Sequence, residues 1–220
     1  MARESYRRQL DELSDAVLSM GNLVASRLGK GLEALKRPEP ELIEELFRGD
    51  DEVDRLYSKI ERRCIDLLAL QQPVAVDLRL ITTAFKISTD IERVGDIAVN
   101  LGQYARNYHL NLRLLPHEQL FSIGDLVTTM VYESLKAFYD KDPRRAEEVL
   151  ELDDQVDRMF WDLVSRLIED LRGSPDRGEE IVTGAVALLL SIRDLERVAD
   201  HAVNIAARTI YMIESRADYI

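Results

Sequence analysis

The sequence repeats itself once, at an offset of 103 to 104 residues. Residues 20–55 align on 123–158 without a gap, and residues 90–100 return at 194–204 with eight of eleven positions identical. Charged and amide residues match as well as apolar ones, which two unrelated amphipathic helices would not show. The chain is therefore an internal duplication, and its fold must be one that two similar halves can build.

Each half has the pattern of long helices. Apolar residues recur at spacings of three and four, and proline and glycine divide these stretches. We expect helices near residues 2–36, 40–70, 74–108, 117–140, 143–172 and 177–216. Short connections favour antiparallel neighbours. The predicted fold is all-α, with two tandem antiparallel three-helix bundles at residues 1–110 and 111–220.

Amino-acid composition limits which kinds of partner the protein can bind and in which cellular compartment we expect it. Lys plus Arg number 29 and Asp plus Glu 41, a net charge of −12, which disfavours nucleic acid because its phosphates must be neutralised by basic side chains. The single cysteine, Cys64, and the absence of an N-terminal signal pattern predict a cytoplasmic protein. The most apolar stretch, residues 181–192, is much shorter than the roughly 20 residues that span a bilayer, so no direct membrane insertion is expected.

Acidic residues recur as pairs four positions apart. There are four such pairs: Asp50 with Asp54, Glu92 with Asp96, Asp153 with Asp157, and Glu196 with Asp200. On a helix this spacing places both carboxylates on one face, where like charges cost a few tenths of a kcal/mol. A cation between them would remove that cost, so the repetition of the pattern predicts cation binding.

The positions of the pairs sharpen this prediction. The first two pairs are centred at residues 52 and 94, equally far from Pro73, and the second two are centred symmetrically about the loop 173–178. Residues equally far from the turn of an antiparallel hairpin face each other, so each repeat should gather four carboxylates. Oxygen donors favour hard cations, and four per site suit more than one ion. Asn100 and Asn204 continue the same face, as ligands or as groups that orient a carboxylate.

Simpler interpretations compete with a metal site. The carboxylates could be solvated surface charge, or could form salt bridges with arginines in the same motifs, which are Arg55, Arg93, Arg158 and Arg197. His201 occurs in one copy only, which argues against a histidine ligand. The aromatic residues Tyr104, Tyr108, Phe160 and Trp161 are expected to pack in the bundle or at helix ends.

The motifs together resemble a known family. The segment Gln-Pro-Val-Ala-Val-Asp-Leu-Arg-Leu-Ile at 72–81 and Asp-Ile-Glu-Arg-Val-Gly-Asp at 90–96 are similar to the signature of PhoU, the regulator of bacterial phosphate uptake. The four acidic pairs are similar to that family's metal motifs. One departure is that the second copy lacks the Asp-Leu-Arg element, so the role of that element is expected from the first half only.

The resemblance implies a non-enzymatic regulator. It would be a cytoplasmic homodimer that represses the phosphate-starvation response by contacting the phosphate ABC transporter and its sensor histidine kinase. Its carboxylate motifs would hold metal, with multinuclear iron clusters in some relatives, and the identity stays open among iron, zinc, magnesium, manganese and calcium. Two alternatives remain: a metal-dependent bundle enzyme of the phosphatase or oxidase type, and a purely structural helical interaction module.

Overall fold

The chain folds into helices only, over the residues that its structure, a computed structural model, describes: 2–108, 117–173 and 178–216. The helices are α1 (Ala2–Lys36), α2 (Pro40–Arg48), α3 (Asp50–Gln71), α4 (Ala75–Tyr108), α5 (His117–Asp140), α6 (Pro143–Gly173) and α7 (Glu179–Glu214). The predicted all-α class is confirmed. Residues 109–116 and 174–177 lie outside the described residues, so the expected loop at 109–116, most of the expected loop at 173–176 and the predicted start of the last helix at 177 are not described.

The second predicted helix is wrong in one respect, because it is divided at Gly49 into α2 and α3. The cause is Arg27 of α1, which lies almost fully buried against this point. Its Nη2 donates a 2.6 Å hydrogen bond to the Leu46 carbonyl oxygen. A Cβ at position 49 would lie 1.6 Å from Arg27 Nη1, so only glycine leaves room for the guanidinium.

The equivalent helix of the second repeat, α6, is continuous. Its start is well capped: Pro143 is its first residue, and Asp142 Oδ1 accepts hydrogen bonds from the backbone N–H groups of Arg144 (3.1 Å) and Arg145 (3.3 Å). The equivalent of Asp142 is Glu39, which makes no such side-chain cap at the start of α2. The two repeats therefore differ where their second helices begin.

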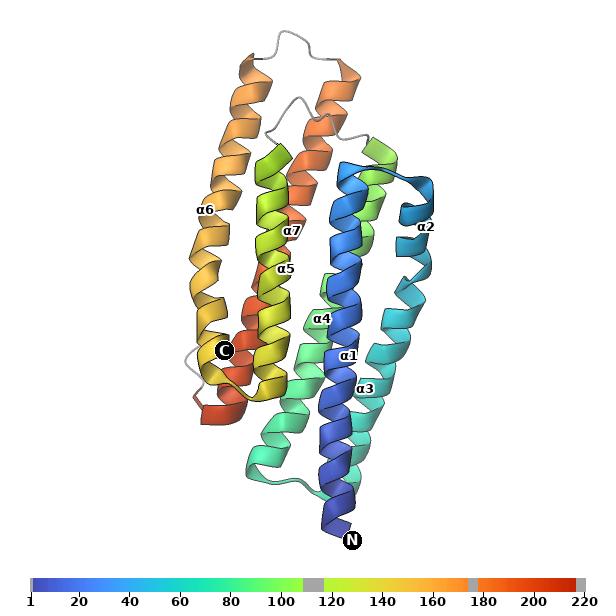
Figure 1. Cartoon of the computed structure of the whole chain (residues 1–220), viewed down its shortest axis with the longest axis vertical. Helices are drawn as coiled ribbons and strands as arrows, with labels where there is room; N and C mark the ends of the chain where they lie inside the picture. The colour runs from blue at the N-terminus through green and yellow to red at the C-terminus, as the bar shows by residue number, and fades with distance from the viewer. Residues whose placement is uncertain (1, 109–116, 174–177, 217–220) are drawn as a thin grey trace.

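Four helices form the seam between the repeats. α4 of the first repeat packs against α7 of the second, and α1 packs against α5. Figure 1 shows these helices in the middle of an elongated molecule, with α6 at one lateral edge and α2 and α3 at the other. Each three-helix unit thus buries one side against its neighbour and leaves its outer hairpin helix at the edge.

The contact between α1 and α5 is reciprocal. A Cβ on Gly21 would lie 2.5 Å from a methyl carbon of Leu135, and a Cβ on Gly124 would lie 2.6 Å from a methyl carbon of Leu32. Gly21 and Gly124 occupy equivalent positions in the two repeats, as do Leu32 and Leu135. Each leucine therefore fills the space above the other repeat's glycine, which lets the two helices approach closely.

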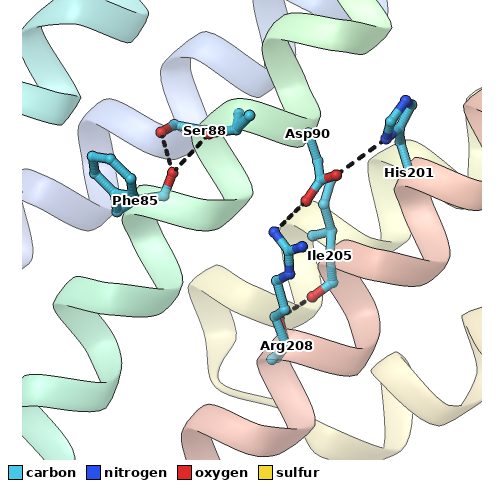
Figure 2. A network of polar contacts seen from close by, with 8 residues as sticks. Phe85, Ser88, Asp90, His201, Ile205 and Arg208 are labelled. Carbon is cyan, nitrogen blue, oxygen red and sulfur yellow. Dashed lines mark hydrogen bonds and ion pairs between the residues drawn. The ribbon is translucent and has the colours of Figure 1, made fainter. Parts of the chain in front are cut away.

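The contact between α4 and α7 is reciprocal as well, but polar. Asp90 of α4, 2% exposed, accepts hydrogen bonds from Arg208 Nη1 (2.6 Å) and from His201 Nδ1 (3.1 Å) of α7, as Figure 2 shows. Its equivalent, Asp194 of α7, is 4% exposed and accepts hydrogen bonds from Tyr104 (2.9 Å) and Asn100 (3.3 Å) of α4. Two buried carboxylates thus tie the repeats together.

The Asp-Leu-Arg element also has a structural contact. Arg79 Nε donates a 3.0 Å hydrogen bond to the carbonyl oxygen of Met212, near the C-terminal end of α7. This bond satisfies one of the carbonyl groups that a helix end leaves free. Arg79 therefore joins the start of α4 to the other repeat. No helix among the described residues is long and apolar enough to cross a membrane.

Candidate metal centres

The structure places the eight predicted residues on two helical hairpins. In the first repeat, Asp50 and Asp54 lie on α3, and Glu92 and Asp96 lie on α4; we call these four residues cluster 1. In the second repeat, cluster 2 consists of Asp153 and Asp157 on α6 and Glu196 and Asp200 on α7. Pro73 lies between α3 and α4, as the symmetry of the acidic pairs predicts.

Small residues bring the two helices of each hairpin together beside the carboxylates. Gly95, between Glu92 and Asp96 in sequence, is buried, and a Cβ there would lie 3.3 Å from Cγ1 of Val53 on α3. The equivalent residue of the second repeat is Ala199, which is also buried. This packing fixes the level at which the acidic pairs of the two helices meet.

The carboxylates of cluster 1 lie within electrostatic reach of one another. Partial burial is the main cause that raises the pKa of Glu92, and the charges of Asp96, Asp54 and Asp50 raise it further. Burial likewise raises the pKa of Asp96, with Asp50 and Asp54 as further causes. The pKa of Asp50 is raised by burial and by Asp54, against the opposing effect of Arg27. The hairpin therefore gathers all four groups from both helices.

Cluster 2 has the same organisation. Burial raises the pKa of Glu196, and Asp200, Asp157 and Asp153 add to the shift. Burial and then Asp157 and Asp200 raise the pKa of Asp153. For Asp200 burial raises the pKa most, while His201 and Arg197 lower it. Each cluster thus concentrates negative charge that would be stabilised by a cation.

The salt-bridge interpretation accounts for little of this charge. Within the part of the chain that the structure describes, Asp50 is the one cluster carboxylate with a basic group inside 4.0 Å, namely Arg27 Nη2 at 3.9 Å. Two of the arginines in the motifs bind elsewhere: Arg55 Nε donates to the Asp51 carbonyl oxygen, and Arg197 Nη1 donates to Asp194. The arginines therefore leave most of the cluster carboxylates without an ion pair.

The donor set fits a hard cation, although its side chains do not close around one point. All eight groups are carboxylates, which suit iron, manganese, magnesium or calcium. Among the described residues, no three Asp, Glu, His or Cys side chains are placed closely enough together to hold one ion as they stand. Cluster carboxylates are half-buried or exposed, so they have room to reorient toward an ion.

Several neighbouring residues have other roles than metal binding. His201 is buried against Asp90 in the inter-repeat contact. Asn100 orients a carboxylate, but that of Asp194 and not one in cluster 1. The expectation that Trp161 packs in the bundle or at a helix end is wrong: it is 66% exposed within α6, and its ring and that of Phe160 form a T-shaped pair.

The sequence analysis did not identify Arg27 and Asp90 as functional residues, although the sequence around each has a pattern that indicates a buried contact. Asp90 falls on the apolar stripe of α4 between Ile87 and Ile91, where a charged residue must have a buried partner. Arg27 falls on the apolar stripe of α1, and the repeat aligns it with the buried Met130. A charged residue inside a stripe that is apolar in the other copy indicates a specific buried contact.

Fold and site together define a class: duplicated helical bundles with one four-carboxylate cluster on the hairpin of each repeat. Comparison with known proteins identifies this class. The model of the PhoU domain matches residues 17–105 and 120–209, one match per repeat. The chain therefore belongs to the PhoU family.

Relatives cover nearly the whole chain. A phosphate-specific transport system accessory protein PhoU homolog of Clostridium acetobutylicum is 30% identical over 98% of this chain and 97% of its own. A protein of the same description from Aquifex aeolicus is 37% identical over 94% of this chain and 92% of its own.

Crystal structures agree with the fold. PhoU from Pseudomonas aeruginosa superposes with a TM-score of 0.89 at 29% identity, over 96% of this chain and 100% of that one. The phosphate transport system regulatory protein PhoU from Streptococcus pneumoniae gives 0.87 at 28% identity, over 96% and 98% of the two chains.

Proposed function

We propose that this protein is a non-enzymatic, metal-binding adaptor that negatively regulates phosphate uptake and the phosphate-starvation response. Its partners are the cytoplasmic faces of the phosphate ABC transporter and of the associated sensor histidine kinase. The observation that carries the proposal is the presence, in a PhoU-family chain, of two equivalent carboxylate clusters, most of whose members form no ion pair with any residue that the structure describes. The relatives' descriptions as accessory and regulatory proteins of phosphate transport support the choice of partner.

The metal would neutralise each cluster and fix α3 relative to α4 and α6 relative to α7. Cluster 1 and cluster 2 would hold the ions, iron, manganese, zinc, magnesium or calcium, with room for a multinuclear centre. Neutralisation would change the charge that each hairpin presents to a partner. Metal occupancy would thereby affect docking without any catalytic step.

Exposed apolar side chains offer a docking surface at the turn between α3 and α4. Leu70, Val74 and Val76 are 75%, 74% and 59% exposed. They lie in and next to the Pro-Val-Ala-Val segment, which resembles the PhoU signature. Such a group of exposed apolar residues is typical of a protein interaction site.

Binding to purified partners tests the proposal. The protein is immobilised and offered the transporter's ATPase subunit or the cytoplasmic part of the kinase, with Mn²⁺ or with chelator. We expect capture of at least one partner, and weaker capture for the paired variant Val74→Ser with Val76→Ser. The variant Tyr132→Ser, which also removes an exposed apolar side chain but on α5, is the matched control and should bind like the wild type.

Other outcomes would favour the alternatives. Hydrolysis of a phosphate ester by the metal-loaded protein, lost on Glu92→Gln and Glu196→Gln, would favour the bundle enzyme. If the protein bound neither metal nor either partner, the result would favour the purely structural helical interaction module. Sedimentation velocity tests the proposed homodimer, which predicts a mass twice that of the 25.2 kDa chain.

A further inference from the structure

Clusters 1 and 2 have the same carboxylates but different surroundings. The largest difference is Arg27, whose side chain is 6% exposed and whose Nη2 lies 3.9 Å from Asp50 Oδ1. The equivalent position in the second repeat holds Met130, which is fully buried and uncharged. One repeat therefore has a fixed positive charge beside its cluster where the other has a thioether.

The guanidinium cannot readily leave this position. It donates a hydrogen bond to the Leu46 carbonyl oxygen, and it passes over Gly49, where the Cβ of any other residue would overlap it. In the second repeat, Leu152 replaces Gly49 and packs against the core. The first repeat thus has Arg27 and Gly49 at the two positions where the second repeat has Met130 and Leu152.

More distant charges differ in the same direction. Lys30 and Arg48 line a pocket of about 260 Å³ beside Arg27 and Gly49. Their equivalents in the second repeat are Glu133 and Glu151. These surface charges are partly offset, because Lys30 pairs with Glu45, Arg48 with Glu44 and Glu133 with Arg145. The buried Arg27 is therefore the main charge difference between the surroundings of the two clusters.

We propose that Arg27 acts as a built-in counter-ion for Asp50 and makes cluster 1 the weaker of the two cation sites. The inference rests on the proposed metal binding, which it deepens. A bound cation at cluster 1 must share Asp50 with a positive charge that is already in place, and it is repelled by that charge. Among the described residues, no basic group lies within 4.0 Å of a cluster 2 carboxylate, and His201 and Arg197 act on Asp200 only from farther away, so we expect cluster 2 to fill first as the free metal concentration rises.

The size of the effect follows from Coulomb's law. A unit charge several ångströms from a divalent ion, at the effective dielectric constant of a protein surface, changes affinity by roughly tenfold or more. Because Arg27 is buried, its effect should persist in salt. The contribution of Lys30 and Arg48 should instead shrink as ionic strength rises.

Site-selective titration with Mn²⁺, followed by the electron paramagnetic resonance of the free ion, tests the proposal. Glu196→Gln with Asp200→Asn leaves cluster 1 alone, and Glu92→Gln with Asp96→Asn leaves cluster 2 alone. We expect cluster 2 to bind Mn²⁺ at least tenfold more tightly. Adding Arg27→Gln to the protein that retains cluster 1 should remove most of the difference, since glutamine keeps a donor for Leu46 but has no charge.

Two further variants control for misfolding of the Arg27→Gln protein and for a general effect of surface charge on metal affinity. Arg27→Met with Gly49→Leu transplants the second repeat's pair into the first and should also tighten binding at cluster 1, with the fold checked by circular dichroism. Lys30→Glu with Arg48→Glu should tighten binding only at low salt. Equal affinities of the two clusters, or no change on Arg27→Gln in a folded protein, would overturn the proposal. If neither cluster bound Mn²⁺ more than a protein with both clusters removed, the proposed metal function itself would fail.

Discussion

At the scale of single residues, two buried aspartates hold the repeats together, and they do so with different partners. Asp90 accepts from a guanidinium and an imidazole, whereas Asp194 accepts from a phenol, an amide and the partly exposed Arg197. A buried carboxylate that loses its charged partner is costly, and so is a partner that loses its carboxylate. The two equivalent positions should therefore differ in their contribution to stability.

We expect Asp90→Ala to lower the free energy of unfolding by about 3 kcal/mol, because Arg208 and His201 lose a buried acceptor. Asp194→Ala should cost less, about 1 to 2 kcal/mol, since its partners are mostly neutral. Urea denaturation of both variants measures the difference. Equal losses would mean that the charge of Arg208 adds nothing to the contribution of Asp90.

The raised pKa values of Glu92 and Asp96 predict how the stability of the metal-free protein depends on pH. Burial and mutual repulsion raise the pKa of Glu92 and Asp96, so the folded state binds more protons than the unfolded state between the ordinary and the raised values. Their contribution is destabilising above the raised values and fades as pH falls through them. In chelator, this contribution should therefore make the wild type gain stability as pH falls from neutral through the raised pKa values.

The variant Asp54→Asn with Glu92→Gln and Asp96→Asn isolates that contribution. It spares Asp50, which lies beside the buried Arg27. At neutral pH in chelator it should be more stable than the wild type by about 1 kcal/mol, and the gap should close at lower pH. Thermal melts across this range measure it. A variant less stable than the wild type at neutral pH would instead support salt bridges as the role of these carboxylates.

At the scale of helices, proline and glycine punctuation predicts most boundaries because it acts through local backbone geometry. The break at Gly49 escapes that reasoning, since it depends on Arg27, 22 positions earlier in the chain. A glycine between two helical stretches is compatible with a continuous helix until a side chain from another helix takes a carbonyl oxygen. The same limit applies to the site: symmetry about Pro73 predicts which carboxylates meet, but not which cation lies beside them.

Gly49→Ala should therefore be destabilising by about 2 kcal/mol or more, because the new methyl group would overlap the guanidinium of Arg27. Gly29→Ala is the matched control on the exposed face of α1, where a Cβ meets no other atom within 4 Å. That change should stabilise the protein by about 0.5 to 1 kcal/mol through helix propensity. Denaturant midpoints of the two variants should move in opposite directions, and a shared direction would show that Arg27 does not constrain position 49.

At the scale of the whole molecule, each cluster draws its carboxylates from one repeat. Glu92→Ala with Asp96→Ala should therefore remove about half of the bound metal at saturation and leave cluster 2 filled. When the free metal concentration is 100 times the dissociation constant of cluster 2, binding there should stabilise the fold by roughly 2.7 kcal/mol. Elemental analysis after dialysis against metal measures the loss. Glu196→Ala with Asp200→Ala should give the complementary half. Complete loss in either variant would indicate one site shared by the two repeats.

The reciprocal packing of α1 on α5 has a consequence for how the halves came to share a chain. Each repeat carries one leucine knob and one glycine socket, so each is complementary to a copy of itself. Two separate three-helix chains with this surface could build the same seam as a dimer. Tethering them replaces a bimolecular encounter by one at an effective concentration in the millimolar range. It also frees each half to change on its own, and Arg27 in one half against Met130 in the other is such a divergence.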